Sequence, residues 1–279
     1  MIKLSWMARA DSEAELENQL KYARKIDLDV IDFHIGKFPR TTKFLRHIKK
    51  EALKAGLPIG YLGGPTLVGE ADGRKKRMDQ AKQDVDLTGF LGAQMLRMFA
   101  RHKWPATVEE QEKYWKPMIE DFQELADYAA PKGVALGLQN HNHSSFCMNA
   151  DQALRILKEV NRENFTYLMD SGQWQGSIGG SPRGFRDINV DIYKDYMERM
   201  APHTTLVRAK IYKIDNGWEE WIDYPRVFKI LAKAKFNGNV SIVFEGGEPP
   251  RNRFDDDQCV ALAAKHLREV AALSNLYDV

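Results

Sequence analysis

The stretch Val134-Ala-Leu-Gly-Leu-Gln-Asn-His-Asn-His143 changes character along its length. It begins with small and apolar residues, which is typical of a strand that is buried on both faces. It then becomes polar, with amides and imidazoles where the apolar run stops. Since alternate residues of a strand point to the same side, Gly137, Gln139 and His141 are predicted to share one face. We interpret the stretch as a core strand whose carboxyl end enters a functional site.

The same alternation of short apolar runs and longer helical patterns extends over the whole chain. We predict strands at 2–6, 30–34, 58–62, 94–100, 134–141, 165–170, 204–211 and 240–245. We predict helices at 12–26, 42–55, 73–91, 108–132, 149–160, 191–200, 224–234 and 255–273. Ser12 and Asp255 are expected to cap the first and last of these helices. The run Gly63-Gly64-Pro65 is expected to end the third strand in a loop.

Alternating strand and helix units imply a parallel sheet. Eight units in 279 residues, with no Pro/Ser-rich linker, predict a single domain over residues 1–279 with the fold of a (β/α)8 TIM barrel. A doubly wound open sheet is the competing α/β fold. No G-x-G-x-x-G follows the first strand, which weakens the dinucleotide-binding version of that alternative.

The composition narrows the class of protein. The net charge is only +2, from 41 basic and 39 acidic residues, so we expect no nucleic-acid partner. No run of about 18 apolar residues occurs, so we expect no membrane span. Cys147 and Cys259 lie far apart in the sequence, which favours a reducing compartment. With no signal-peptide pattern at the N-terminus, we expect a cytoplasmic location.

A barrel of this type carries its active site at the carboxyl ends of the strands. Polar residues from distant parts of the sequence fall at these ends: His34, Arg97, Gln139, His141, Asp170, Gln173, Arg208, Lys210 and Glu245. Each of them is also compatible with a purely structural role, such as binding loop backbone groups or, for Arg97, forming an ion pair. Trp104, Trp174 and Trp218 are compatible with stacking on a sugar face or with a place in the core.

Several motifs resemble those of one known group of proteins. They are LGAQMLRMF at 91–99, AAPKGVALGLQNH at 129–141, LMDSG at 168–172, LVRAK at 206–210, IDYP at 222–225 and FNGNVSIVFEG at 236–246. Together they resemble the xylose-isomerase-like TIM-barrel superfamily, which contains sugar-phosphate isomerases and epimerases and, more distantly, the AP endonuclease family 2 enzyme endonuclease IV. The resemblance covers nearly the whole chain and implies a carbohydrate as the small-molecule partner. It also implies a homo-oligomer, a dimer or a tetramer.

The resemblance implies one divalent ion (Mn, Mg, Zn or Co), held by Glu, Asp, His and Glu at the ends of strands five to eight. This chain departs from that pattern, because the corresponding residues are Gln139, Asp170, Arg208 and Val243. A register slip of one residue pair would instead place Glu245 at the last position. An amide, a guanidinium and an isopropyl group in place of three ligands predict that the usual metal site is lost, so that no cofactor is expected.

Two functional hypotheses follow. In the first, the protein is an isomerase, epimerase or lyase that abstracts a proton next to a sugar carbonyl. The catalytic residues are then Lys210, Glu245, Asp170 and Arg208, with Lys210 or Glu245 as acid/base and Arg208 stabilising the oxyanion. The substrate-binding residues are Gln139, His141, Arg97, His34, Trp104 and Gln173. Arg97, with Arg101 and Lys103, would suit an anionic group.

In the second hypothesis, the protein is a non-catalytic sugar-binding or partner subunit that has kept the site and lost the chemistry. A DNA-repair nuclease is a poor third reading. It would need many more histidine and carboxylate ligands, and a stripe of positive charge along the phosphate path.

Overall fold

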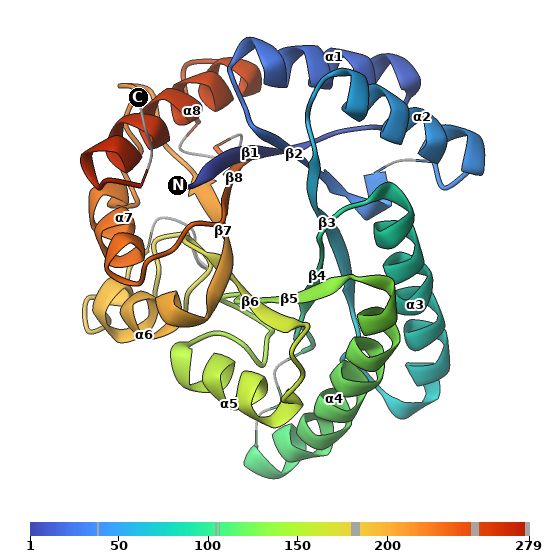
Figure 1. Cartoon of the computed structure of the whole chain (residues 1–279). Helices are drawn as coiled ribbons and strands as arrows, with labels where there is room; N and C mark the ends of the chain where they lie inside the picture. Colours follow the sequence, from blue (N-terminus) through green and yellow to red (C-terminus); the bar gives the residue numbers. More distant parts are fainter. Residues whose placement is uncertain (38, 104, 106, 180–184, 247–250, 277–279) are drawn as a thin grey trace.

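Eight parallel strands close into one barrel in the order of the sequence. The computed structural model describes residues 1–37, 39–103, 105, 107–179, 185–246 and 251–276. The strands are β1 (Lys3–Ala8), β2 (Val30–His34), β3 (Ile59–Thr66), β4 (Met95–Phe99), β5 (Ala135–Gln139), β6 (Phe165–Asp170), β7 (Thr204–Ile211) and β8 (Asn239–Phe244). Pairing of β1 with β8 as well as with β2 closes the ring, which is seen end-on in Figure 1. The predicted (β/α)8 barrel is confirmed.

Helices cover the outside of the barrel (Figure 1). They are α1 (Glu13–Lys25), α2 (Thr42–Lys54), α3 (Arg74–Leu91), α4 (Val108–Ala129), α5 (Ala150–Val160), α6 (Glu198–Met200), α7 (Tyr224–Lys233) and α8 (Asp256–Leu273). The predicted caps are confirmed, since the side chain of Ser12 accepts from the backbone N–H of Glu15, and Asp255 forms a capping box with Gln258.

The segment between β6 and β7 departs from the predicted single α-helix over 191–200. It begins as the π-helical segment η4 (Ile192–Met197) and becomes α-helical only in α6. The wider π turn brings Ile192 and Met197, which are five positions apart, to the same buried side. The sequence pattern does not distinguish a π turn from an α turn over so short a stretch.

The third strand is longer than predicted. Instead of ending in a loop at the glycine pair, β3 continues to Thr66 and pairs with β4 on the way. The glycines are there because the neighbouring strand lies close. A Cβ atom on Gly64 would be 2.5 Å from the backbone oxygen of Arg97, nearer than any side chain tolerates. The expectation of a loop at Gly63-Gly64-Pro65 was therefore wrong.

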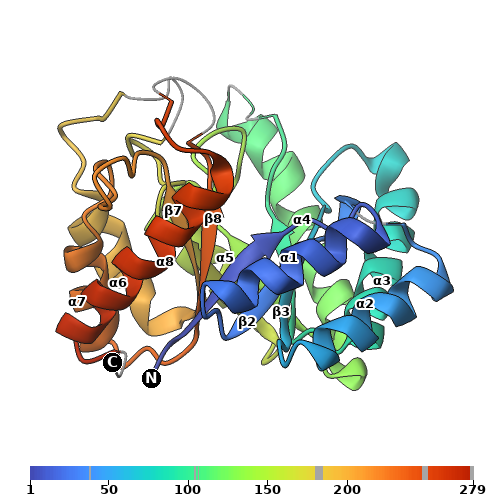
Figure 2. The same cartoon turned by 90° about the horizontal axis from the view of Figure 1, so that it is seen from above.

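The inside of the barrel is filled in layers. A small apolar cluster of Tyr61, Met95, Leu168 and Leu206 occupies its middle, with Met7 packed against it. Three residues of this cluster, Met95, Leu168 and Leu206, are each followed two positions later by a polar residue on the same face of the strand. A polar layer therefore lies next to the apolar cluster, on the side of the carboxyl ends of the strands. Figure 2 shows the barrel from the side, with the N-terminus at the end opposite the loops that follow the strands. None of the described helices is long and apolar enough to cross a membrane.

Candidate functional site

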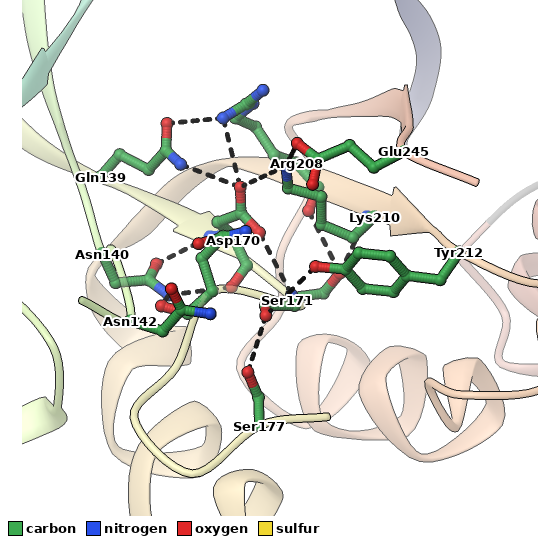
Figure 3. A network of polar contacts seen from close by, with 12 residues as sticks. Gln139, Asn140, Asn142, Asp170, Ser171, Ser177, Arg208, Lys210, Tyr212 and Glu245 are labelled. Atoms are coloured by element: carbon green, nitrogen blue, oxygen red, sulfur yellow. Dashed lines mark hydrogen bonds and ion pairs between the residues drawn. The ribbon is translucent and has the colours of Figure 1, made fainter. Parts of the chain in front are cut away.

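Five of the predicted residues meet in one hydrogen-bonded and ion-paired network at the carboxyl ends of four consecutive strands (Figure 3). Gln139 ends β5, Asp170 ends β6, Arg208 and Lys210 lie on β7, and Glu245 follows β8. Asp170 and Arg208 are register partners, as are Arg208 and Ser241. Because paired residues of adjacent strands point to the same side, the network faces the inside of the barrel.

Arg208 joins Gln139 to Asp170. Its Nη1 donates to Oε1 of Gln139 at 2.7 Å and to Oδ2 of Asp170 at 3.2 Å. Nε2 of Gln139 donates to the same carboxylate oxygen at 2.9 Å. Burial disfavours the charge of Arg208, but Asp170 and Glu245 favour it, and its pKa lies above the usual value. The amide of Gln139 is therefore a neutral bridge between a fixed cation and a fixed anion.

Lys210 connects Asp170 to Glu245. Its Nζ contacts Oε1 of Glu245 directly and lies 3.9 Å from Oδ2 of Asp170. Lys210 is only 2% exposed, and this burial lowers its pKa against the opposing effect of the two carboxylates. Burial likewise raises the pKa of Asp170, although Lys210 and Arg208 oppose the shift. Glu245 is partly exposed, so it is the carboxylate of the network that solvent can reach.

Asn140 holds this network in place, a role that was not predicted from the sequence. Its Nδ2 donates to the backbone oxygens of Asp170 and Gln173, both at 2.9 Å. Its Oδ1 accepts from the backbone N–H of Asp170 at 2.8 Å and from the hydroxyl of Tyr167 at 2.9 Å. This fully buried amide therefore satisfies four groups where β5 and β6 end. The only sequence signal was its position beside Gln139, where alternation points it away from the barrel interior.

Arg97 lies beside the network without joining it. It is 3% exposed, and its guanidinium stacks on the ring of Phe99 at 4.3 Å. Phe99 is the register partner of Gln139, and its ring meets that of His141 edge-on at 5.6 Å. Burial and the charge of Arg208 lower the pKa of Arg97 to about 9, which leaves it charged at neutral pH. No carboxylate of the described residues lies within ion-pairing distance of Arg97, so the alternative of a structural ion pair finds no partner among them.

His34 lies close to Arg97. A Cβ atom on Gly63 would be 3.1 Å from Nη2 of Arg97 and 3.3 Å from Cδ2 of His34, so both side chains flank this glycine. His34 is exposed, and its Nδ1 accepts from the backbone N–H of Gly36 at 3.2 Å. The lack of a side chain at Gly63 leaves room for the guanidinium at the end of β3.

His141 is held in one neutral form. Its Nδ1 lies 2.8 Å from the backbone oxygen of His143. A carbonyl oxygen only accepts, so Nδ1 carries the hydrogen and Nε2 keeps its lone pair. Burial lowers the pKa of His141 to about 4, and the neutral form therefore prevails at neutral pH. This side chain can accept a hydrogen bond from a hydroxyl group.

The remaining predicted site residues are less closely connected to the network. Gln173 is buried and supplies its backbone oxygen to Asn140, while its Oε1 has no partner among the described residues. Trp104 lies outside the described residues. Trp174 is a core residue, fully buried and stacked on Tyr196 at 5.4 Å, so it offers no face to a sugar. Trp218 is half exposed and packs against His266.

A second polar group inside the barrel was missed by the sequence reading. Asp32 of β2 is fully buried and accepts from the hydroxyl of Ser5 and from the backbone N–H of Tyr61 at 3.0 Å. Burial raises the pKa of Asp32 to about 6, with Arg208 among the groups that oppose the shift. A polar residue at an inward position of an otherwise apolar strand, as in Val30–His34, is the signal that could have found it.

The four positions that correspond to metal ligands in the family do not form a cation site. Oε1 of Gln139 and Oδ2 of Asp170 both accept from Nη1 of Arg208, and Val243 has no donor atom. Val243 pairs with Lys210 in register and so faces inward, as expected. Among the described residues, no group of three or more His, Cys, Asp or Glu side chains could hold a metal ion.

Known proteins match the chain at the level of fold. It resembles an L-ribulose 3-epimerase (TM-score 0.76, 18% identity, 98% of this chain and 94% of that chain). It also resembles D-psicose 3-epimerase with D-tagatose from Clostridium cellulolyticum H10 (TM-score 0.73, 14% identity, 99% and 100%). A third similar structure is a xylose isomerase-like TIM barrel protein from Mycobacterium smegmatis in complex with magnesium (TM-score 0.67, 14% identity, 98% and 96%).

At these identities the structural likeness establishes the fold alone. No curated protein sequence matches the chain. The family model described as xylose isomerase-like TIM barrel matches residues 20–270, which is most of the chain. The chain therefore belongs to the xylose isomerase-like TIM barrel family.

Proposed function

We propose that the protein is a sugar isomerase or epimerase that moves a proton on a carbon next to a carbonyl group. The observation that carries this proposal is the contact between Lys210 and Glu245, a buried ammonium against a partly exposed carboxylate, beside the guanidinium of Arg208. An acid, a base and a fixed positive charge at the end of a barrel are what this reaction requires. Structures with the same fold include an L-ribulose 3-epimerase and a D-psicose 3-epimerase, which agrees with this proposal.

The chemical step follows from the charges of the pair. The Glu245 carboxylate takes the proton from the carbon next to the carbonyl, and the electron pair of that C–H bond moves to the carbonyl oxygen. The ammonium of Lys210 and the guanidinium of Arg208 stabilise the negative charge on this oxygen. Return of the proton to the other face of the same carbon gives the epimer. Its delivery to the former carbonyl carbon gives the isomer when the proton of the neighbouring hydroxyl passes to the former carbonyl oxygen, which makes that hydroxyl the new carbonyl. His141 Nε2 accepts from a sugar hydroxyl and helps to orient the ring.

The cation at the centre of this site is Arg208 in place of a divalent metal ion. The side chains at the family's ligand positions do not fit such an ion, because Arg208 already occupies the oxygens of Gln139 and Asp170. A guanidinium is charged at every physiological pH and can donate two parallel hydrogen bonds to an enediolate. Asp170 fixes its position and is itself not exposed to the substrate side.

The test is exchange of the sugar's C–H proton in deuterated water, followed by proton NMR on a panel of ketoses and keto sugars. For at least one sugar, we expect the NMR signal of the proton on the carbon next to the carbonyl group to disappear. Lys210→Met and Glu245→Gln should each slow this exchange by roughly 100-fold or more, the usual contribution of a general acid or base. Lys229→Met is the matched control. Lys229 is exposed on α7, one of the helices that cover the outside of the barrel.

Two results would contradict the proposal. If sugars bind but no C–H proton exchanges, the protein is a non-catalytic sugar-binding subunit. If exchange depends on one tightly bound Mn, Mg, Zn or Co ion per chain, the assignment of the central charge to Arg208 is wrong. Metal analysis of the purified protein by mass spectrometry, before and after dialysis against a chelator, separates the second result from the first.

A further inference from the structure

Arg97 is the buried cation that the proposed reaction does not use. The carboxylates of the network already have cationic partners, since Asp170 is bonded to Arg208 and Glu245 to Lys210. Asp32 is bonded to Ser5 and to the backbone of Tyr61. The guanidinium of Arg97 stacks on the face of Phe99, and its Nε has no hydrogen-bond partner among the described residues.

A buried charge without a partner is costly, because burial removes water and no carboxylate replaces it. Arg97 also lies close enough to Arg208 for the two like charges to disfavour each other. The fold nevertheless prepares its position: the ring of Phe99 supports one face of the guanidinium, and Gly63 leaves space beside Nη2. An anion bound at this position would relieve both costs.

We infer that Arg97 binds a carboxylate group of the substrate, so that the substrate is an acidic keto sugar instead of a neutral one. A guanidinium and a carboxylate form two parallel hydrogen bonds, and an unpartnered Nε with its neighbouring Nη offers that pattern. The inference deepens the proposed function, because it assumes that the same strand ends hold a sugar. It assigns Arg97 to substrate recognition and leaves the proton transfer to Lys210 and Glu245.

A carboxylate fits better than a phosphate. One carboxylate carries one negative charge, which matches the one positive charge of Arg97. A phosphate carries nearly two charges and is usually bound by several backbone N–H groups at a helix N-terminus in addition to an arginine. Arg97 lies on a strand, within the barrel, and is stacked on an aromatic ring. No such array of backbone donors at a helix N-terminus surrounds it in the described residues.

The experiment compares ligands that differ only in charge, by isothermal titration calorimetry with the full chain. The probes are D-tagaturonate, its neutral counterpart D-tagatose and D-tagatose 6-phosphate. We expect D-tagaturonate to bind roughly 10- to 100-fold more tightly than D-tagatose, as a hydrogen bond between charged groups usually provides. Arg97→Gln should remove most of this difference, with D-tagatose affected by less than about twofold, and Arg97→Lys should retain part of it.

Arg46→Gln is the matched control, because it is the same substitution at an exposed position of α2 with no contact to the strand ends. It should leave the affinity for both sugars unchanged. Thermal melting followed by circular dichroism checks that each variant is folded. If Arg97→Gln does not fold, comparing the affinities of the unaltered protein for D-tagaturonate and D-tagatose still tests whether an acidic sugar is preferred.

Equal affinity of the unaltered protein for D-tagaturonate and D-tagatose would overturn the inference. Tighter binding of the 6-phosphate than of the carboxylate would overturn the choice of carboxylate. If D-tagatose exchanges its proton and D-tagaturonate binds no more tightly than D-tagatose, the proposed function stands and this inference fails. If the acid binds through Arg97 and no sugar exchanges a proton, this inference stands and the proposed function fails.

Discussion

Arg208 on β7 donates a hydrogen bond of 2.7 Å to the side chain of Gln139 on β5, passing over the end of β6, where Asp170 binds both of them. The two side chains suit each other, because an amide oxygen accepts a hydrogen bond from a guanidinium without adding a negative charge to the network. Each residue also explains the other. A glutamate at 139 would place a second carboxylate beside Asp170, and a neutral residue at 208 would leave Asp170 with Lys210 alone at 3.9 Å.

Restoring the family's glutamate with Gln139→Glu should not create a metal site. Arg208 would remain 2.7 Å from the oxygen at position 139 and would form an ion pair with the new carboxylate. We expect no stoichiometric Mn binding by this variant in calorimetry or in metal analysis after dialysis. The triple change Gln139→Glu, Arg208→His and Val243→Glu supplies the full ligand set and serves as the comparison. Tight Mn binding by the single variant would show that Arg208 can move aside.

Removing the central cation with Arg208→Met should destabilise the protein. Asp170 is fully buried and would lose its closest ion-pair partner, while Gln139 would lose the donor to its Oε1. Loss of one partner of a buried pair costs about 3 to 5 kcal/mol of unfolding free energy. Urea denaturation at neutral pH measures this difference. Lys75→Met is the control, because Lys75 and Asp79 form an exposed pair on α3 that is worth less than about 1 kcal/mol.

Asn140→Ala should weaken the protein at the junction of β5 and β6. The change leaves the backbone oxygens of Asp170 and Gln173, the N–H of Asp170 and the hydroxyl of Tyr167 without this partner. Buried groups without partners cost about 1 to 3 kcal/mol each, and partial relaxation leaves an expected loss of about 2 to 4 kcal/mol. Chemical denaturation gives the value. Asn216→Ala, at an exposed side chain bonded to Glu220, should cost less than about 1 kcal/mol, and an equal cost at both positions would refute the anchoring role.

Glu219 should make the stability of the protein depend on pH. This carboxylate is buried in the loop after β7, where it accepts from the backbone N–H groups of Tyr212, Lys213 and Trp221. Burial raises its pKa from 4.5 to about 7 against these hydrogen bonds. The folded state then binds the proton more tightly than the unfolded state. Stability from this group is full at low pH, falls as the pH rises toward about 7, and is constant above that value.

The size of the effect of Glu219 is roughly 3 kcal/mol, from the shift of its pKa. His141 and His266, whose pKa burial lowers to about 4, give the opposite slope in part of the same range. The measurement is therefore the difference in unfolding free energy between the unaltered protein and Glu219→Gln, from about pH 4.5 to 8. A difference that does not change with pH would show that Glu219 is not protonated in this range.

Local patterns in the sequence were the most predictive. Strand and helix periods come from residues a few positions apart, and they predicted β2, β6 and β7 with the bounds that the structure gives. Alternation along β7 and β8 predicted which side chains face inward, including Val243 opposite Lys210. The position of polar residues at strand ends predicted that Gln139, Asp170, Arg208, Lys210 and Glu245 would meet.

The sequence alone does not show which groups these residues bind. Which acceptor Arg208 binds, and that Arg97 binds none of the described carboxylates, depends on the stagger of the closed barrel and on the rotamers that fit inside it. The same applies to β3, which continues through its glycines because β4 lies so close. It also applies to Trp174, which belongs to the segment after β6 and is fully buried in the core. Composition and periodicity determine which side chains each strand carries on each of its faces. The distances between strands, and which of several donors binds a given acceptor, are set only by the tertiary structure. By itself, then, the sequence determined a barrel with a polar rim, and the tertiary structure decided that Arg97 of that rim is buried against Phe99 without an ion pair to a carboxylate of the described residues.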